Sequence, residues 1–71
     1  MARKQKMTAE QGAHIAAAQQ SLTNGSAFVV YVPDSGYEVY DREQAAIWSK
    51  FVFIEATYVN GKLVATAKAA A

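Results

Sequence analysis

Cysteine is absent from this 71-residue sequence, and histidine occurs only once, at position 14. Without a thiol, the chain can form neither a disulfide nor a thiolate metal site. A single histidine leaves only oxygen ligands for a metal ion, and the carboxylates stand at no recognised ligand spacing. We therefore expect no metal. The lack of disulfides in so small a domain indicates a reducing compartment, the cytoplasm.

Long apolar runs and glycine-rich loops are lacking as well. The basic residues 1–6 are followed by Glu10, Gln11 and His14, which interrupt any apolar signal segment. No stretch reaches the roughly 20 apolar residues of a membrane span. The glycines stand apart from one another and form no phosphate-binding loop. We therefore expect no cofactor and no membrane association.

The inventory of catalytic side chains is equally short. His14 is the only imidazole, and Glu10, one helical turn before it, would make an ordinary contact between positions i and i+4. The acidic residues in the middle of the chain fall in turns, on exposed strand positions or at a helix start, where carboxylates have structural roles. These observations predict a protein that is not an enzyme and has no catalytic residues.

The residues that are present favour one folded domain. Hydrophobic residues make up 52% of the sequence, and the β-branched and aromatic ones gather after position 27. We expect a single domain over residues 8–68, between a flexible basic arm at residues 1–7 and a frayed end at residues 69–71. A core of this size is thin, and pairing with a second copy would thicken it.

Local patterns predict a first helix that begins at Thr8 and ends at Asn24-Gly25. Thr8 and Gln11 match a capping box, in which each side chain bonds the other residue's backbone N–H. Asparagine and glycine tolerate the left-handed conformation that closes a helix. The apolar stripe expected to face the core consists of Ile15, Ala18 and Leu22.

A second capping box at Asp41 predicts a helix over residues 42–50. The side chains that it would offer to the core are Ala45, Trp48 and Ile47. We expect Trp48, with Phe51 and Phe53, to fill the space between this helix and the sheet. The alternative is that these three aromatic side chains form a hydrophobic dimer surface.

Four β-type runs complete the pattern. Residues 27–32 and 37–40 flank a turn at residues 33–36, and the run at residues 51–59 leads into Asn60-Gly61, the strongest type I′ hairpin signal in the sequence. A two-residue loop there pairs Val59 with Lys62, Tyr58 with Leu63, Thr57 with Val64, Glu55 with Thr66 and Phe53 with Lys68.

That register predicts which faces of the last hairpin are buried. The expected core face consists of Ile54, Ala56, Tyr58, Leu63, Ala65 and Ala67. The opposite face is too apolar for plain solvent exposure, so a helix or the second subunit of a homodimer would cover it. The order α-β-β-α-β-β predicts an α+β fold, a four-stranded antiparallel sheet with two helices packed on one face. The strand order does not follow from the sequence.

Tyrosines and acidic residues gather around the turn at residues 33–36. Tyrosine supplies rigid contact area with a polar tip and is enriched in interfaces. The predicted partner-binding residues are Tyr31, Asp34, Tyr37, Glu38, Tyr40, Asp41 and Glu43. Such a patch suits a basic protein surface, including the nucleic-acid-binding surface of another protein. The alternative is that the tyrosines only complete the sheet.

The basic arm is the second candidate surface, with Arg3, Lys4 and Lys6. These side chains could neutralise phosphates and give salt-dependent binding of nucleic acid. Three charges are few, however, and the rest of the chain is acidic on balance. No RNA-binding consensus of the Arg/Lys-Gly-aromatic type is present. Nucleic-acid binding is therefore the alternative hypothesis.

A small, cysteine-free α+β domain with so few catalytic side chains is similar, as a class, to phage and mobile-element accessory proteins. Many proteins of that class, anti-CRISPR proteins among them, inhibit a host enzyme or defence complex by occupying its surface. Size and character carry this likeness, and no sequence motif does. It implies a protein-binding module, an inhibitor or adaptor, that acts in the host cytoplasm if it is phage-encoded. This is the function we expect.

Overall fold

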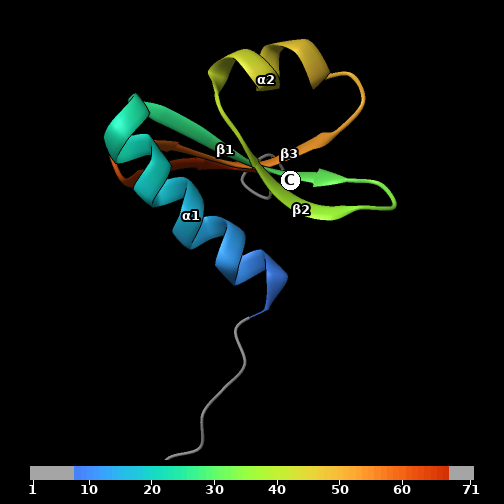
Figure 1. The fold of residues 1–71 in the computed structure, drawn as a ribbon, viewed down its shortest axis with the longest axis horizontal. Coiled ribbons are helices and arrows are strands. Elements are labelled where there is room, and N and C mark those ends of the chain that lie inside the picture. Colours follow the sequence, from blue (N-terminus) through green and yellow to red (C-terminus); the bar gives the residue numbers. More distant parts are fainter. Residues whose placement is uncertain (1–7, 68–71) are drawn as a thin grey trace, which may run out of the picture.

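The structure is a computed structural model that describes residues 8–67. Its elements are, in chain order, Ala9–Asn24 (α1), Ser26–Val32 (β1), Gly36–Tyr40 (β2), Arg42–Trp48 (α2), Phe53–Val59 (β3) and Lys62–Thr66 (β4). The predicted α+β fold and element order are confirmed, and α1 packs against the sheet (Figure 1). The predicted arm at residues 1–7 and frayed end at residues 69–71 lie outside the described residues.

The four strands form one antiparallel sheet in the order β2-β1-β3-β4. Because β1 pairs antiparallel with both β2 and β3, these two strands run in the same direction on either side of it. The β1–β2 and β3–β4 hairpins need only short turns, whereas parallel strands need a long connection. α2 lies on that connection and carries the chain across β1 (Figure 1).

α1 faces the sheet with small side chains. Ala13, Ala17 and Ser21 are buried at a spacing of four residues, and Ala17 and Ser21 are completely buried. The predicted stripe was wrong at Ile15 and Leu22, which are 50% and 68% exposed, whereas Ala18 is partly buried and packs against the core as predicted. Short side chains let the helix backbone approach the sheet and pack at native density. The buried residues that complete this core are Ala27, Val29, Ala56 and Tyr58.

α2 covers less of the sheet than α1 does. It begins at the predicted capping box, where the Gln44 N–H donates to Asp41 Oδ1 at 2.7 Å, but it ends at Trp48, two residues earlier than predicted. It lies beside the sheet face that α1 leaves free, near β1 and β2, so the two helices lie on opposite faces of the sheet and not together on one face as expected (Figure 1). Ala45 is the one buried residue among its seven. A helix of two turns with a single buried side chain leaves most of its apolar surface in contact with water.

The hairpin at Asn60-Gly61 has the predicted type I′ turn, with φ values of 52° and 84° at these residues. The first two predicted pairs, of Val59 with Lys62 and of Tyr58 with Leu63, are confirmed. Beyond them the register shifts by one residue, so that Ala65 pairs with Thr57 and Thr66 with Ala56. The predicted pairs of Thr57 with Val64 and of Glu55 with Thr66 were therefore wrong. The predicted pair of Phe53 with Lys68 lies outside the described residues.

The shift reflects a β-bulge, in which one strand carries an extra residue and bends. A bulge cannot be read from alternation alone, because it changes which side chains share a face. Ala56 and Tyr58 are buried as predicted, whereas Leu63 is half exposed and Ala65 is exposed. The last hairpin therefore contributes core residues from β3 and leaves β4 as an exposed edge strand.

The end of α1 holds the last hairpin in place. The Gly61 N–H donates to Ser21 Oγ at 2.7 Å, and this hydroxyl donates in turn to the Ala18 carbonyl at 2.8 Å. The Asn60 N–H donates to the Gly25 carbonyl at 3.1 Å. A Cβ on Gly61 would lie 2.8 Å from Leu22 Cδ2, so a larger residue would displace that exposed side chain, and the φ of 84° itself favours glycine. We call these residues (Ser21, Leu22, Gly25, Asn60 and Gly61) the hairpin end.

Candidate functional site

The predicted partner-binding residues are divided between the two faces of the sheet. Neighbouring residues on a strand point to opposite faces. Tyr31 shares the face of the core residue Val29 and pairs with Tyr37, so both tyrosines lie on the side of α1. Glu38 and Tyr40 alternate with Tyr37 along β2 and lie on the other side. The structure thus brings Tyr31 and Tyr37 together on one face of the sheet and places Glu38 and Tyr40 on the opposite face.

The remaining acidic residues of the predicted set lie at the two ends of β2. Asp34 has a φ of 71° at the third position of a turn closed by a 2.9 Å hydrogen bond from the Ser35 N–H to the Val32 carbonyl. A positive φ at that position is typical of a type II turn. Asp41 caps α2 through its carboxylate, and Glu43 lies exposed in the first turn of that helix. Asp41 therefore has a structural role.

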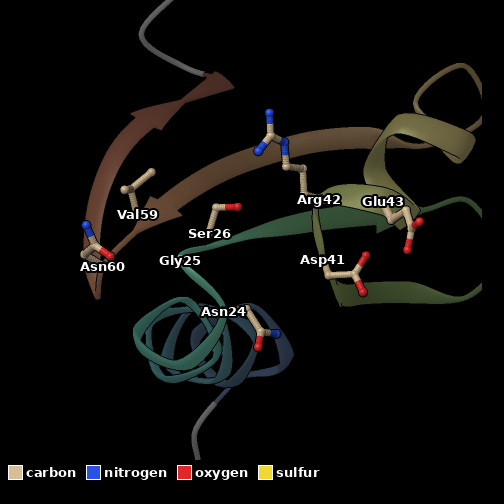
Figure 2. Close-up of a pocket in the computed structure, with 8 residues that line it drawn as sticks. All are labelled: Asn24, Gly25, Ser26, Asp41, Arg42, Glu43, Val59 and Asn60. Carbon is tan, nitrogen blue, oxygen red and sulfur yellow. The ribbon is translucent and has the colours of Figure 1, made fainter.

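A polar cleft of about 710 Å³ lies between the start of α2 and the hairpin end (Figure 2). Its lining residues are Asn24, Gly25, Ser26, Asp41, Arg42, Glu43, Val59 and Asn60. Asp41 and Arg42 point away from each other across it (Figure 2). Among residues 8–67, no three His, Cys, Asp or Glu side chains are grouped as metal ligands. The lining of the cleft is mostly polar.

His14 takes part in packing. Its Nδ1 lies 2.6 Å from the Tyr58 hydroxyl, and the two rings meet edge to face with centroids 5.6 Å apart. This contact joins α1 to β3 at the margin of the core. A buried tyrosine hydroxyl requires a hydrogen-bond partner, and His14 supplies it.

Large aromatic side chains lie exposed at the end of the molecule opposite the hairpin end. Trp48, Phe51 and Phe53 are 48%, 66% and 61% exposed, which contradicts their predicted role in filling the core. The Trp48 and Phe51 rings meet edge to face at 6.1 Å, and the Phe51 N–H donates to the Trp48 carbonyl. A second bulge, in β3 opposite Val29 and Val30, interrupts the alternation of that strand. Phe53 therefore pairs with Tyr31 and points to the α1 side of the sheet, where α2 cannot cover it.

Tyr31 and Tyr37 lie at the same end of the sheet, where Tyr31 pairs with Phe53 on one side and with Tyr37 on the other. Their rings meet edge to face at 5.2 Å, and Tyr31 is itself exposed. The β1–β2 turn and the loop that joins α2 to β3 both lie at this end (Figure 1). We call the five residues Tyr31, Tyr37, Trp48, Phe51 and Phe53 the aromatic end.

The folded state raises the pKa of Tyr37 above its ordinary value. Partial burial raises the pKa of its hydroxyl, and the carboxylates of Glu10 and Glu55, followed by Tyr31, raise it further. α1 joins β1 through Gly25 and runs back along the sheet, so its first turn, with Glu10, lies near the start of β2. Sequence reasoning missed Glu10 and Glu55 as site residues, because they come from α1 and β3. The one signal in the sequence was that Phe53 and Glu55 stand two residues apart in the same predicted strand, a spacing that predicts one shared face.

Comparison with known proteins adds no relative from which a function could be transferred. No protein-family model, curated protein or solved structure matches the chain. No helix in the described part is long and apolar enough to cross a membrane. The functional argument therefore rests on the geometry of the two ends.

Proposed function

We propose that the chain is a small non-catalytic protein-binding module, an inhibitor or adaptor of the phage-accessory type. It would act in the cytoplasm by occupying the surface of a larger protein or nucleoprotein complex. The observation that carries this proposal is the exposure of Trp48, Phe51 and Phe53 at one end of the molecule. Single exposed apolar residues are ordinary, but several large aromatic side chains exposed at one end of a small domain are typical of an interaction site.

The size of the patch suits the centre of an interface. At about 200 Å² for each aromatic side chain, the exposed fractions of the three residues amount to roughly 350 Å². One side of a standard protein interface buries about 800 Å². Tryptophan and tyrosine at the centre of an interface contribute much of its binding energy. The aromatic end can therefore supply the anchors, with polar neighbours as the rim.

Affinity capture of the tagged protein from a cell lysate, with and without nuclease, tests the proposal. We expect one dominant protein partner that survives nuclease and is lost from the variant Phe51→Ser/Phe53→Thr. Val64→Thr, which changes an exposed apolar residue on β4, is the matched control and should retain the partner. Partners that disappear with nuclease would instead favour nucleic-acid binding by Arg3, Lys4 and Lys6.

A further inference from the structure

We propose that Tyr31, Tyr37 and Phe53 bind a lysine or arginine side chain presented by a basic segment of another protein. This inference rests on the proposed function and specifies the chemistry of the partner. It concerns the α1 side of the aromatic end, where Tyr37, Tyr31 and Phe53 are cross-strand neighbours on β2, β1 and β3.

The register creates a row of aromatic side chains. Tyr37, Tyr31 and Phe53 are direct partners across three adjacent strands, which are about 4.8 Å apart in a sheet. Tyr31 and Phe53 are exposed, and Tyr37 is partly buried against the core. A cation within about 6 Å of a ring centre is attracted by the face of that ring. The row therefore offers several ring positions to a cation that approaches from solvent.

The electrostatic environment of this row is negative. Glu10 from α1 and Glu55 from β3 both act on the Tyr37 hydroxyl. Residues 8–67 contain all six acidic residues of the chain and three of its seven basic ones, a formal net charge of −3. Of the three basic residues within residues 8–67, Arg42 and Lys62 lie toward the hairpin end. Lys50 follows α2 next to Phe51 and lies at the aromatic end.

These charges select among the classes of partner. Nucleic-acid phosphates would be repelled by the carboxylates of Glu10 and Glu55. A second copy carries a formal net charge of +1 over its whole sequence, so charge does not separate it from a basic partner, and the oligomeric state measured below does. A basic peptide is attracted by the aromatic row and by the carboxylates of Glu10 and Glu55, because a guanidinium group stacks on aromatic faces and donates hydrogen bonds to carboxylates. The geometry thus favours arginine over lysine as the bound side chain.

Titration with a labelled twelve-residue peptide of alternating arginine and serine tests the inference, with fluorescence anisotropy as the readout at low salt. A peptide with citrulline in place of arginine is the control probe, because it keeps the shape and loses the charge. We expect the arginine peptide to bind and the citrulline peptide to bind at least about threefold more weakly, as removal of a cation–aromatic contact implies. Equal binding of the two peptides would overturn the inference.

Variants locate the binding on the molecule. Glu10→Gln/Glu55→Gln should weaken binding of the arginine peptide about threefold to tenfold, because two ion pairs with the peptide would be lost. Phe53→Leu keeps an apolar side chain, removes the ring and should weaken binding about twofold to fivefold. Glu43→Gln, a carboxylate in the first turn of α2, is the matched control and should change binding less than about twofold. A loss with Glu43→Gln as large as with the double variant contradicts the proposed site.

The same variants separate this inference from the proposed function. If the captured partner is lost with Phe51→Ser/Phe53→Thr but retained with Glu10→Gln/Glu55→Gln, the protein is a binding module whose partner is not recognised by charge. Light scattering that shows a dimer, converted to monomer by Glu10→Gln/Glu55→Gln, would assign the site to a second copy and overturn the inference. Circular dichroism of each variant establishes that it is folded.

Discussion

At the hairpin end, the small residue Ser21 is buried and hydrogen-bonded, whereas at the aromatic end the large side chains of Phe51 and Phe53 are mostly exposed. Ser21 is completely buried and bonds both its own helix and the Gly61 N–H. Phe51 and Phe53 are each more than half exposed. Hydrophobicity alone therefore does not identify the residues that hold this fold. What distinguishes the two ends is whether the side chain fits between α1 and the sheet.

The fit between α1 and the sheet depends on short side chains. Ala13 and Ala17 from the helix meet Ala27 and Ala56 from the sheet, with Val29 among the few larger buried residues. Each small side chain contributes little transfer free energy, because that contribution scales with the apolar area buried. Close approach and satisfied hydrogen bonds must therefore provide much of the stability at this interface. The difference between the two ends can be tested by substitution.

The largest effect is expected for Ala17→Leu. Leucine would force α1 away from the sheet, and overpacking of this kind costs about 1–3 kcal/mol. The whole free energy of unfolding of a domain with 60 described residues is roughly 3–9 kcal/mol. Urea unfolding followed by circular dichroism measures the loss. Ala16→Leu, on the exposed side of the same helix, is the control and should be within about 0.5 kcal/mol of the unsubstituted protein.

Ser21→Ala should have the next largest effect. It removes the acceptor of the Gly61 N–H, and a backbone donor left unpaired at a part-buried site costs about 1–3 kcal/mol. Thr23→Ala, an exposed substitution two residues further along α1, should cost less than about 0.5 kcal/mol. Faster hydrogen exchange at the Gly61 amide would show that the hairpin has been released. Equal stability of the two variants would contradict the role given to the hairpin end.

Substitutions at the aromatic end should affect stability much less. Phe51→Ser and Phe53→Thr change side chains that are mostly exposed, so each should lower the free energy of unfolding by less than about 0.5 kcal/mol. The same urea unfolding experiment measures this difference. A loss of 2 kcal/mol or more, about the size expected in the core, would mean that these rings support the fold and would remove the contrast between the two ends.

The smallest effect concerns alkaline pH. The folded state raises the pKa of Tyr37 above its ordinary value of 10.0, so the unfolded chain ionises this hydroxyl first. The resulting stability is present below pH 10.0 and is lost as the pH rises from there through the folded pKa. Tyr37→Phe should therefore lose less stability than the unsubstituted protein when thermal unfolding is followed across this range. Identical losses would show that the folded state does not raise the pKa of the Tyr37 hydroxyl.

Local patterns predicted much of the fold. Thr8 and Asp41 begin their helices as expected, and Asn60-Gly61 forms the expected turn. The exposed face of α1 was predicted wrongly, because periodicity assigns the largest apolar residues, Ile15 and Leu22, to the core. Because α1 lies close to the sheet, only small side chains fit between them, and Ala13, Ala17 and Ser21 face the core instead.

The candidate site was predicted only in part. The adjacency of Tyr31 and Tyr37 follows from a short hairpin turn and was expected. The exposure of Phe53 and its place beside Tyr31 depend on the pairing of β1 with β3, which the sequence did not reveal. The contributions of Glu10 and Glu55 depend on how α1 lies along the sheet.

The sequence by itself determined where helices begin, where chains turn and which segments are strands, because those outcomes depend on interactions within about four residues. Tertiary structure alone decided the strand order, the bulges in β3 and β4, the face that α1 presents to the sheet and the exposure of the aromatic end. Each of these depends on contacts between residues far apart in the chain. The space between packed elements decides which side chains are buried, and local patterns carry no information about that space.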